Sequence, residues 1–306
     1  MDTSTQTRIV DHLRQLGLDE SLYKLEEDEA EFLKAQTGIQ DDEELKKHLL
    51  KGQADAFAVF PYPCIRSFGW TKLKISRLFA YPQLLKLGRE RDRAILLDIG
   101  CCFGNDLRKA IADGYPVQNV VASDLYQGFW DAGHTLFRTT RETFPVPFIA
   151  GDALDPAHLA VVPPFTAPPP GPRPDFAGLT SLNQLQGRVA AVHSASFFHL
   201  FTEEQQLQIA RALAGLVAPE PGSILLGRHA GLPEKGFRTS GATGYKGFCH
   251  SDKSWKELWE GIFGEAGVKV HVDARLMKPE NREVQTHALG VPESDAWWLE
   301  WAVTRL

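Results

Sequence analysis

The sequence predicts an α/β protein: a doubly wound, mostly parallel seven-stranded sheet with an N-terminal helical cap. From residue 95 to residue 303, short apolar runs of strand length alternate with helical patterns. This alternation is typical of a parallel sheet with helices on both faces. Residues 1–55 instead show only apolar stripes at helical spacing. We therefore expect residues 1–90 to form a cap with an aromatic strap, and residues 91–306 to form the main domain.

The composition excludes several classes of protein. The chain has 306 residues, of which 43% are hydrophobic and 24% charged, as in ordinary globular domains. A net charge of −6 argues against a nucleic-acid partner. There is no apolar run near the ~20 residues of a membrane span and no signal-peptide pattern at the N-terminus, so we expect a cytoplasmic protein without a membrane partner. The four cysteines include no CxxC pair, which predicts neither a metal site nor a disulfide framework.

The cap is expected to be helical and to lead into an aromatic strap. Residues 57–70 contain five aromatic side chains, and Pro61 and Pro63 favour an extended path there. The strap is either a hydrophobic link between cap and sheet or one wall of a binding pocket. In the second case Tyr62 and Arg66 would bind substrate, with Arg66 available to a carboxylate. The apolar stripes that predict the helices are Ile9, Leu13, Leu16 and Leu18, then Leu25, Phe32 and Leu33, then Leu45, Leu49 and Leu50.

The main domain shows seven strand-like segments and two long irregular ones. Eight prolines between residues 156 and 186 predict a mobile surface insertion. The glycine-rich residues 229–251 are expected to form a loop, and a tryptophan-rich helix follows them. The predicted strands cover residues 95–98, 120–124, 146–150, 189–194 and 223–228, with 268–276 and 297–303 as a closing antiparallel pair.

The segment from Asp98 to Asp106 has the pattern of a buried strand, a tight turn and the start of a helix. Gly100 and Gly104 let the backbone turn sharply and approach a ligand, because no Cβ stands in the way. The helix start offers unpaired N–H groups. An acid at the strand tip would repel a pyrophosphate, so the pattern favours a ligand with an amine or ribose hydroxyls.

Three acids end three successive predicted strands: Asp98, Asp124 and Asp152. Because the carboxyl ends of parallel strands meet at one edge of the sheet, these side chains should face one crevice. Asp124 lies about 20 residues after Gly104, which is the spacing expected for an acid that hydrogen-bonds ribose hydroxyls. Asp152 could accept a bond from the adenine amine, and Asp98 could bind the amino-acid end of the ligand. Strand-end aspartates are also common turn formers, which is the simpler explanation for any one of them.

These motifs resemble those of the class I S-adenosylmethionine-dependent methyltransferases. Asp98-x-Gly100-x-Cys102-x-Gly104 matches their Asp-x-Gly-x-Gly-x-Gly motif, except that Cys102 replaces the middle glycine. The resemblance implies a Rossmann-like methyltransferase fold and S-adenosyl-L-methionine as cofactor. The residues that it implies for cofactor binding are Asp98, Gly100, Cys101, Gly104, Asp106, Asp124, Leu125, Asp152, Ala153 and Ser194.

A closer resemblance is to fungal secondary-metabolite methyltransferases, including meroterpenoid-pathway enzymes. It rests on residues 62–66, 97–108, 194–201 and 222–228, and in this group the double cysteine Cys101-Cys102 is usual. The resemblance implies an O-methyltransferase that acts on a carboxylate or hydroxyl of a largely apolar small molecule.

The acceptor decides whether a base is needed. A carboxylate is already ionised near neutral pH, whereas a phenol or alcohol benefits from a general base. His199, just past the fourth predicted strand, is the candidate base, while His193 is expected to be a core or strand-end histidine. Candidate substrate-binding residues are Tyr62, Arg66, Phe198, Arg228 and His250.

Two other functions fit the same pattern. A nicotinamide-dependent oxidoreductase also has a glycine-rich turn, although Asp98 would face its pyrophosphate. A protein of this fold could also bind S-adenosylmethionine without methyl transfer, as a binding protein or in a cyclisation. The sequence leaves both open, as it does the oligomeric state, for which a homodimer is one possibility.

Overall fold

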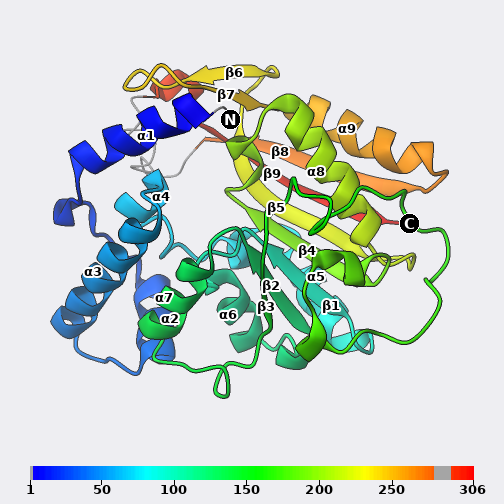
Figure 1. Ribbon diagram of the computed structural model, residues 1–306, viewed down its shortest axis with the longest axis horizontal. Coiled ribbons are helices and arrows are strands. Elements are labelled where there is room, and N and C mark those ends of the chain that lie inside the picture. Colours follow the sequence, from blue (N-terminus) through cyan, green and yellow to red (C-terminus); the bar gives the residue numbers. More distant parts are fainter. Residues whose placement is uncertain (1–2, 279–290) are drawn as a thin grey trace.

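The computed structural model describes residues 3–278 and 291–306, and its centre is a seven-stranded sheet (Figure 1). The strand order is β3-β2-β1-β4-β5-β9-β8. Strands β1 to β5 pair in parallel, and β9 pairs antiparallel with both β5 and β8. The predicted doubly wound, mostly parallel sheet with a closing antiparallel pair is thus confirmed. The strands are β1 Ile95–Ile99, β2 Val120–Asp124, β3 Phe148–Ala150, β4 Val189–Ala195, β5 Ile224–Gly231, β8 Val270–Met277 and β9 Trp297–Arg305.

Helices cover both faces of the sheet because the central strands are apolar on both sides. In β1, Leu97 packs in one layer with residues of α8 and α9, and Leu96 packs in the other with residues of α5 and α6. All five residues of β1 are buried, as expected for the middle of a parallel sheet. The helices of the main domain are α5 Tyr81–Glu90, α6 Asn105–Ala112, α7 Gln127–Leu136, α8 Glu203–Leu216 and α9 Asp252–Glu265.

The N-terminal helices gather at one side of the sheet, on the left of Figure 1. Leu33, Leu45 and Leu49 are buried in one cluster with Phe103 and Phe129 from the main domain. The helical cap therefore shares a core with the chain that follows β1. Whether residues 1–90 and 91–306 fold as two domains stays a prediction. The cap helices are α1 Thr3–Leu16, α2 Glu27–Thr37, α3 Asp42–Val59 and α4 Pro63–Arg66.

The strap is less extended than its prolines suggested. Helix α3 continues to Val59, and Pro63 starts the short helix α4. Proline is well tolerated at the first position of a helix, where its missing N–H would have no intrahelical partner. Only residues 60–62 lie in extended backbone between the two helices.

Two irregular segments also differ from expectation. The glycine-rich residues 229–251 were expected to be a loop, but they contain the antiparallel hairpin of β6 (Gly236–Thr239) and β7 (Lys246–Cys249). The proline-rich insertion ends in a short 3-10 helix, Leu182–Leu185, whose two leucines are fully buried in the core. The end of that insertion is thus anchored under the sheet rather than mobile on the surface.

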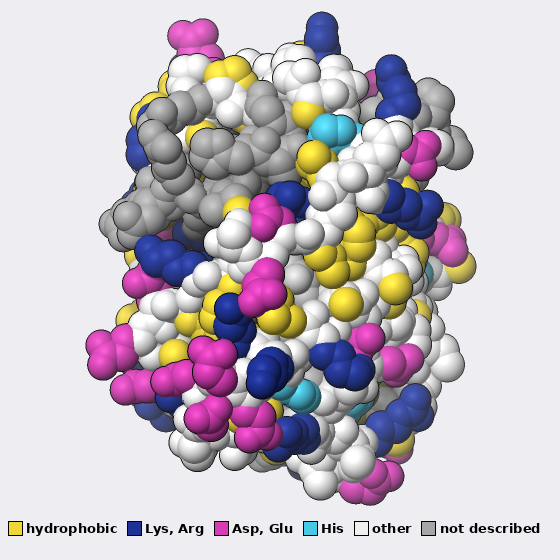
Figure 2. Space-filling view, turned by 90° about the vertical axis from the view of Figure 1, so that its left-hand side faces the viewer, with side chains coloured by type: hydrophobic (Ala, Val, Ile, Leu, Met, Phe, Trp, Pro, Cys, Tyr) yellow, Lys and Arg dark blue, Asp and Glu magenta, His cyan; other side chains and the backbone are white. Residues whose placement is uncertain are grey.

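The surface of the cap side mixes charges of both signs. Figure 2 shows acidic and basic side chains interspersed on this face, in keeping with the slightly acidic composition. Within the described ranges, no helix is both long and apolar enough to cross a membrane.

We expect Leu49→Ala to lower the free energy of unfolding by about 2–5 kcal/mol, because it leaves a cavity in the shared core. Urea unfolding measures the change. Lys51→Ala is the matched control: Lys51 lies on the same helix with its side chain 67% exposed, so its replacement should cost less than about 0.5 kcal/mol. A cap that folds on its own would instead unfold in a separate, earlier transition.

Candidate active site

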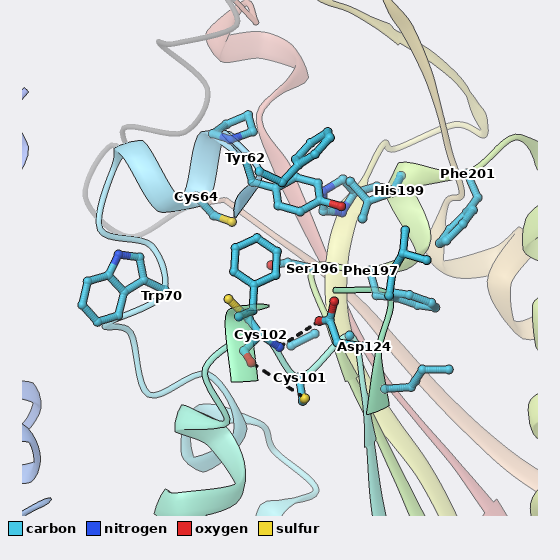
Figure 3. Close-up of a pocket in the computed structure, with 18 of the residues that line it drawn as sticks. Tyr62, Cys64, Trp70, Cys101, Cys102, Asp124, Ser196, Phe197, His199 and Phe201 are labelled. Carbon is cyan, nitrogen blue, oxygen red and sulfur yellow. Dashed lines mark hydrogen bonds between the residues drawn. The ribbon is translucent and has the colours of Figure 1, made fainter. Parts of the chain in front are cut away.

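A cavity of about 390 Å³ lies at the carboxyl ends of the central strands. Residues after β1, β2, β3 and β4 form one side of it. The other side is formed by Ile9 and Leu13 of α1, by residues 60–64 of the strap, and by the β6–β7 hairpin. In Figure 3, Tyr62 and His199 lie on the side opposite Cys101 and Cys102, with Asp124 between. The strap is therefore a pocket wall, one of the two roles that the sequence left open.

The turn after β1 has left-handed backbone at Gly100 (φ 75°), Cys102 (φ 51°) and Gly104 (φ 76°). A Cβ on Gly100 would lie 2.8 Å from the ring of Phe197, so only glycine fits there without displacing that ring. Gly104 is the N-cap of α6 and does not line the cavity, and a Cβ there would lie 2.7 Å from Trp130. Gly104 thus shapes the turn rather than contacting a ligand.

The two strand-tip acids Asp124 and Asp152 line the cavity with Asp98, as predicted. Asp124 accepts hydrogen bonds from the backbone N–H of Cys102 (2.9 Å) and of Tyr126 (3.1 Å). Burial raises the pKa of its carboxyl despite these bonds. Asp152 accepts a bond from the N–H of Leu154 at 2.9 Å. Both acids therefore form turns and also face the cavity.

Asp98 is buried near the end of β1 and is hydrogen-bonded to a side chain of the neighbouring strand β4. Its Oδ1 lies 2.8 Å from Nδ1 of His193 on β4. Burial raises the pKa of Asp98, although His193 opposes this. Burial alone would lower the pKa of His193, but the Asp98 carboxylate outweighs it and raises the pKa.

Near Asp98, the cavity has groups that complement both charges of an amino acid, its ammonium group and its carboxylate. Lys74 lines it and makes no ion pair within the part of the chain that the structure describes. Asn105 donates from Nδ2 to the carbonyl oxygen of Trp70 (2.8 Å), while its buried Oδ1 has no hydrogen-bond partner among the described residues. Asp106 also lines the cavity, and its Oδ1 accepts a bond from the N–H of Ile75 (2.9 Å). An ammonium group and a carboxylate would thus both find partners here, which fits the amino-acid end of S-adenosylmethionine.

The other cofactor predictions have mixed outcomes. Cys101, Leu125 and Ala153 line the cavity, and Leu125 is 48% exposed. Ser194 does not line it, because it is buried inside β4, and the strand tip is formed by Ala195 and Ser196 instead. The prediction for Ser194 was therefore wrong by one or two positions.

Four predicted substrate residues lie outside the cavity. The Nε of Arg66 donates to the carbonyl oxygen of Gly17, and its guanidinium lies beside Asp19. Arg66 therefore links α4 to the segment that follows α1 within the cap. Phe198 is completely buried, and its ring packs against those of Trp255 and Trp301.

Arg228 and His250 also lie outside the cavity. The guanidinium of Arg228 lies over the ring of Trp298, 4.8 Å from its centroid. His250 pairs through Nδ1 with the hydroxyl of Ser254 (2.8 Å) at the start of α9. The predictions for Arg66, Phe198, Arg228 and His250 are corrected accordingly, whereas Tyr62 and His199 do line the cavity.

The contribution of the β6–β7 hairpin was not expected from the sequence. Arg238 and Tyr245 line the cavity from β6 and from the turn before β7. Arg238 and Lys74 are the cationic side chains, Lys or Arg, among the described lining residues. The short alternation Gly236-Phe237-Arg238-Thr239 was the available signal for a strand, but the surrounding glycines obscured it.

His199 is held as a neutral ring. Burial, together with the positive charges of Arg238 and Lys74, lowers its pKa to about 3. Its Nδ1 accepts a long bond from the N–H of Ala230 (3.4 Å), which leaves the ring proton on Nε2. A group with this pKa is a weak base near neutral pH, so the geometry favours His199 as a hydrogen-bond donor over the predicted general base.

No group of three or more His, Cys, Asp or Glu side chains suited to a metal ion occurs among the described residues. The strand order, the glycine turn and the three strand-tip acids are the features that the resemblance to class I S-adenosylmethionine-dependent methyltransferases implies.

Comparison with known proteins identifies the family. Residues 18–71 match the model of the meroterpenoid methyltransferase N-terminal domain. The chain is 33% identical to the O-methyltransferase phiE of Fungal sp. (strain ATCC 74256), over 73% of this chain and 67% of that protein. It is 31% identical to the asnovolin E/chermesin D methyltransferase nvfJ of Aspergillus novofumigatus, over 75% and 74% of the two chains. The chain belongs to this family of fungal methyltransferases.

Among solved structures, a Burkholderia thailandensis 1,6-didemethyltoxoflavin-N1-methyltransferase aligns with a TM-score of 0.47 and 14% identity. The alignment covers 87% of this chain and 91% of that one.

We expect Asp124→Ala to weaken binding of S-adenosylhomocysteine by about 1–3 kcal/mol, because ribose hydroxyls and two backbone N–H groups lose their acceptor. Isothermal titration calorimetry measures the dissociation constant. Asp131→Ala is the control, since Asp131 is exposed on α7 and its carboxylate accepts a hydrogen bond from the side chain of Gln127. Equal dissociation constants for wild type and Asp124→Ala would contradict the assignment.

Proposed function

We propose that this protein transfers the methyl group of S-adenosylmethionine to a carboxylate oxygen of a largely apolar small molecule. The observation that supports a carboxylate is Arg238. Its side chain lines the cavity from β6, and it has no ion-pair partner within the described parts of the chain. A guanidinium in this position offers a fork of donors that matches the two oxygens of a carboxylate.

The remainder of the acceptor side is apolar. The relevant lining residues are Ile9, Leu13, Phe60, Pro61, Pro63, Phe197, Leu200, Phe201 and Trp298. Such a surface favours burial of a hydrocarbon skeleton, while a single cation orients its one charged group. The match to the meroterpenoid methyltransferase N-terminal domain supports a terpenoid-like acceptor, because that matched segment contains the strap.

The chain's residues align and desolvate the reactants rather than move protons. When bound, S-adenosylmethionine supplies an electrophilic methyl group. A carboxylate is already ionised near neutral pH and needs no base. Arg238 would orient it, and the Nε2–H of His199 is available to a second oxygen. Apolar residues of helix α1 and the strap line the cavity, and alignment of the two reactants there would provide most of the rate enhancement.

A hydroxyl acceptor is the second candidate, and the name of the relative phiE, an O-methyltransferase, fits either a carboxylate or a hydroxyl oxygen. It is less well supported here because a hydroxyl would need a base. His199 has a pKa of about 3, and burial raises the pKa of Tyr62 above its usual range. Neither group is suited to accept a proton near neutral pH.

Methyl-labelled S-adenosylmethionine tests the proposal directly. Terpenoid carboxylic acids are offered beside the matching primary alcohols. We expect label in the acids, in a product from which mild alkali releases labelled methanol, because an ester hydrolyses whereas a methyl ether does not. Alkali-stable label in the alcohols would show hydroxyl methylation. Cofactor binding with conversion of an acceptor but no label transfer would point to the non-methylating alternative.

We expect Arg238→Met to raise the KM for the acid acceptor about 10- to 100-fold, since a hydrogen bond to a charged group contributes about 1.5–3 kcal/mol. The dissociation constant of the cofactor should not change. Lys235→Met is the matched control, because Lys235 precedes the same hairpin but pairs with Glu203 on the surface. Equal KM values for Arg238→Met and the control would argue against the role of Arg238.

A further inference from the structure

His193 lies directly behind the acid that ends β1. It is paired in register with Asp98 across the parallel strands β4 and β1. Its Nδ1 is 2.8 Å from Oδ1 of Asp98, and both side chains are almost completely buried. Asp98 lines the cavity and His193 does not. The histidine can therefore influence a ligand only through the carboxylate.

Among the described residues, His193 is the one side-chain donor to the carboxylate of Asp98. A carboxylate removed from water is costly unless it is hydrogen-bonded, and His193 is the side-chain partner that the structure gives it. Because the carboxylate accepts, His193 donates from Nδ1, and its buried Nε2 has no partner within the described residues. The other charged groups acting on the pair are Lys74, before the 3-10 helix Ile75–Arg77, Asp106 on α6 and Asp124 on β2.

We propose that His193 is a positioning residue that holds the Asp98 carboxylate ionised and oriented toward the ammonium group of the cofactor. The inference rests on the cofactor assigned above, but not on the identity of the methyl acceptor. The bond to Nδ1 occupies Oδ1 and leaves Oδ2 for the cavity. It also replaces part of the hydration that Asp98 lost on burial.

The pH dependence of binding follows from this arrangement. Burial raises the pKa of Asp98, and the bond from His193 lowers it again. Without His193, Asp98 would therefore take up a proton at a higher pH. The protonated carboxyl no longer attracts an ammonium group, so affinity in such a variant should fall as the pH falls.

The competing explanation is that the hydrogen bond between His193 and Asp98 only stabilises the pairing of β1 with β4. It would change stability, but it would not give the variant a new pH dependence of ligand affinity. Three variants separate the two explanations. His193→Phe removes the donor and keeps a ring, and His193→Asn restores an N–H near the position of Nδ1. His229→Phe is the matched control, because His229 is equally buried and hydrogen-bonded to Trp301 instead.

The experiment measures binding of S-adenosylhomocysteine by calorimetry between about pH 6 and about pH 8.5, without acceptor or turnover. We expect His193→Phe to bind about 10-fold or more weakly at the acid end and to recover toward the alkaline end. His193→Asn should stay within about threefold of wild type throughout. His229→Phe should lose thermal stability and keep its affinity.

A nitrogen NMR spectrum of histidine-labelled wild-type protein gives a readout that needs no variant to fold. We expect the proton of His193 on Nδ1. A neutral ring with its proton on Nε2 would overturn the proposal, as would a His193→Phe variant with wild-type affinity at every pH. If the wild type itself fails to bind S-adenosylhomocysteine, the cofactor assignment fails instead, which is a distinct result.

Discussion

The hydrogen bond from the Cys102 N–H to the Asp124 carboxylate joins the tips of the first two strands, and the cofactor side of the cavity depends on it. Left-handed backbone costs a non-glycine residue about 1–2 kcal/mol. A hydrogen bond to a charged group returns about 1.5–3 kcal/mol. The bond therefore offsets the strain at Cys102, which explains how a cysteine replaces the middle glycine of the motif. The same bond orients the acid that we assign to the ribose.

Charge is divided between the two sides of the cavity. Four acids and Lys74 lie where the strand tips and α6 meet, and Arg238 lies on the hairpin opposite them. The two cations are thus held on separate segments of the chain. Burial keeps the ring of His199 neutral by lowering its pKa, and both cations act in the same direction. Among the described acceptor-side residues, the charges that would bind anions thus add to burial in making His199 a weak base.

The sequence predicted what depends on topology and missed what depends on side-chain direction. Asp98, Asp124 and Asp152 could be placed together because parallel strands end at one edge. By contrast, Phe198 is in the core while its neighbour Phe197 faces the cavity, and Ser194 is buried while Ser196 lines it. A shift of one or two residues decides such cases. Arg228 and Arg238 could not be distinguished either, because the packing of Arg228 on Trp298 is a tertiary contact.

The acceptor side is assembled from segments that are far apart in the chain: α1, the strap and the hairpin. None of them contains the glycine turn or a strand-tip acid. Substitutions can therefore accumulate in these segments while methyl-donor binding is preserved. Changes in the cap and the hairpin could thus alter the acceptor, while the strand tips that carry the three aspartates stay the same.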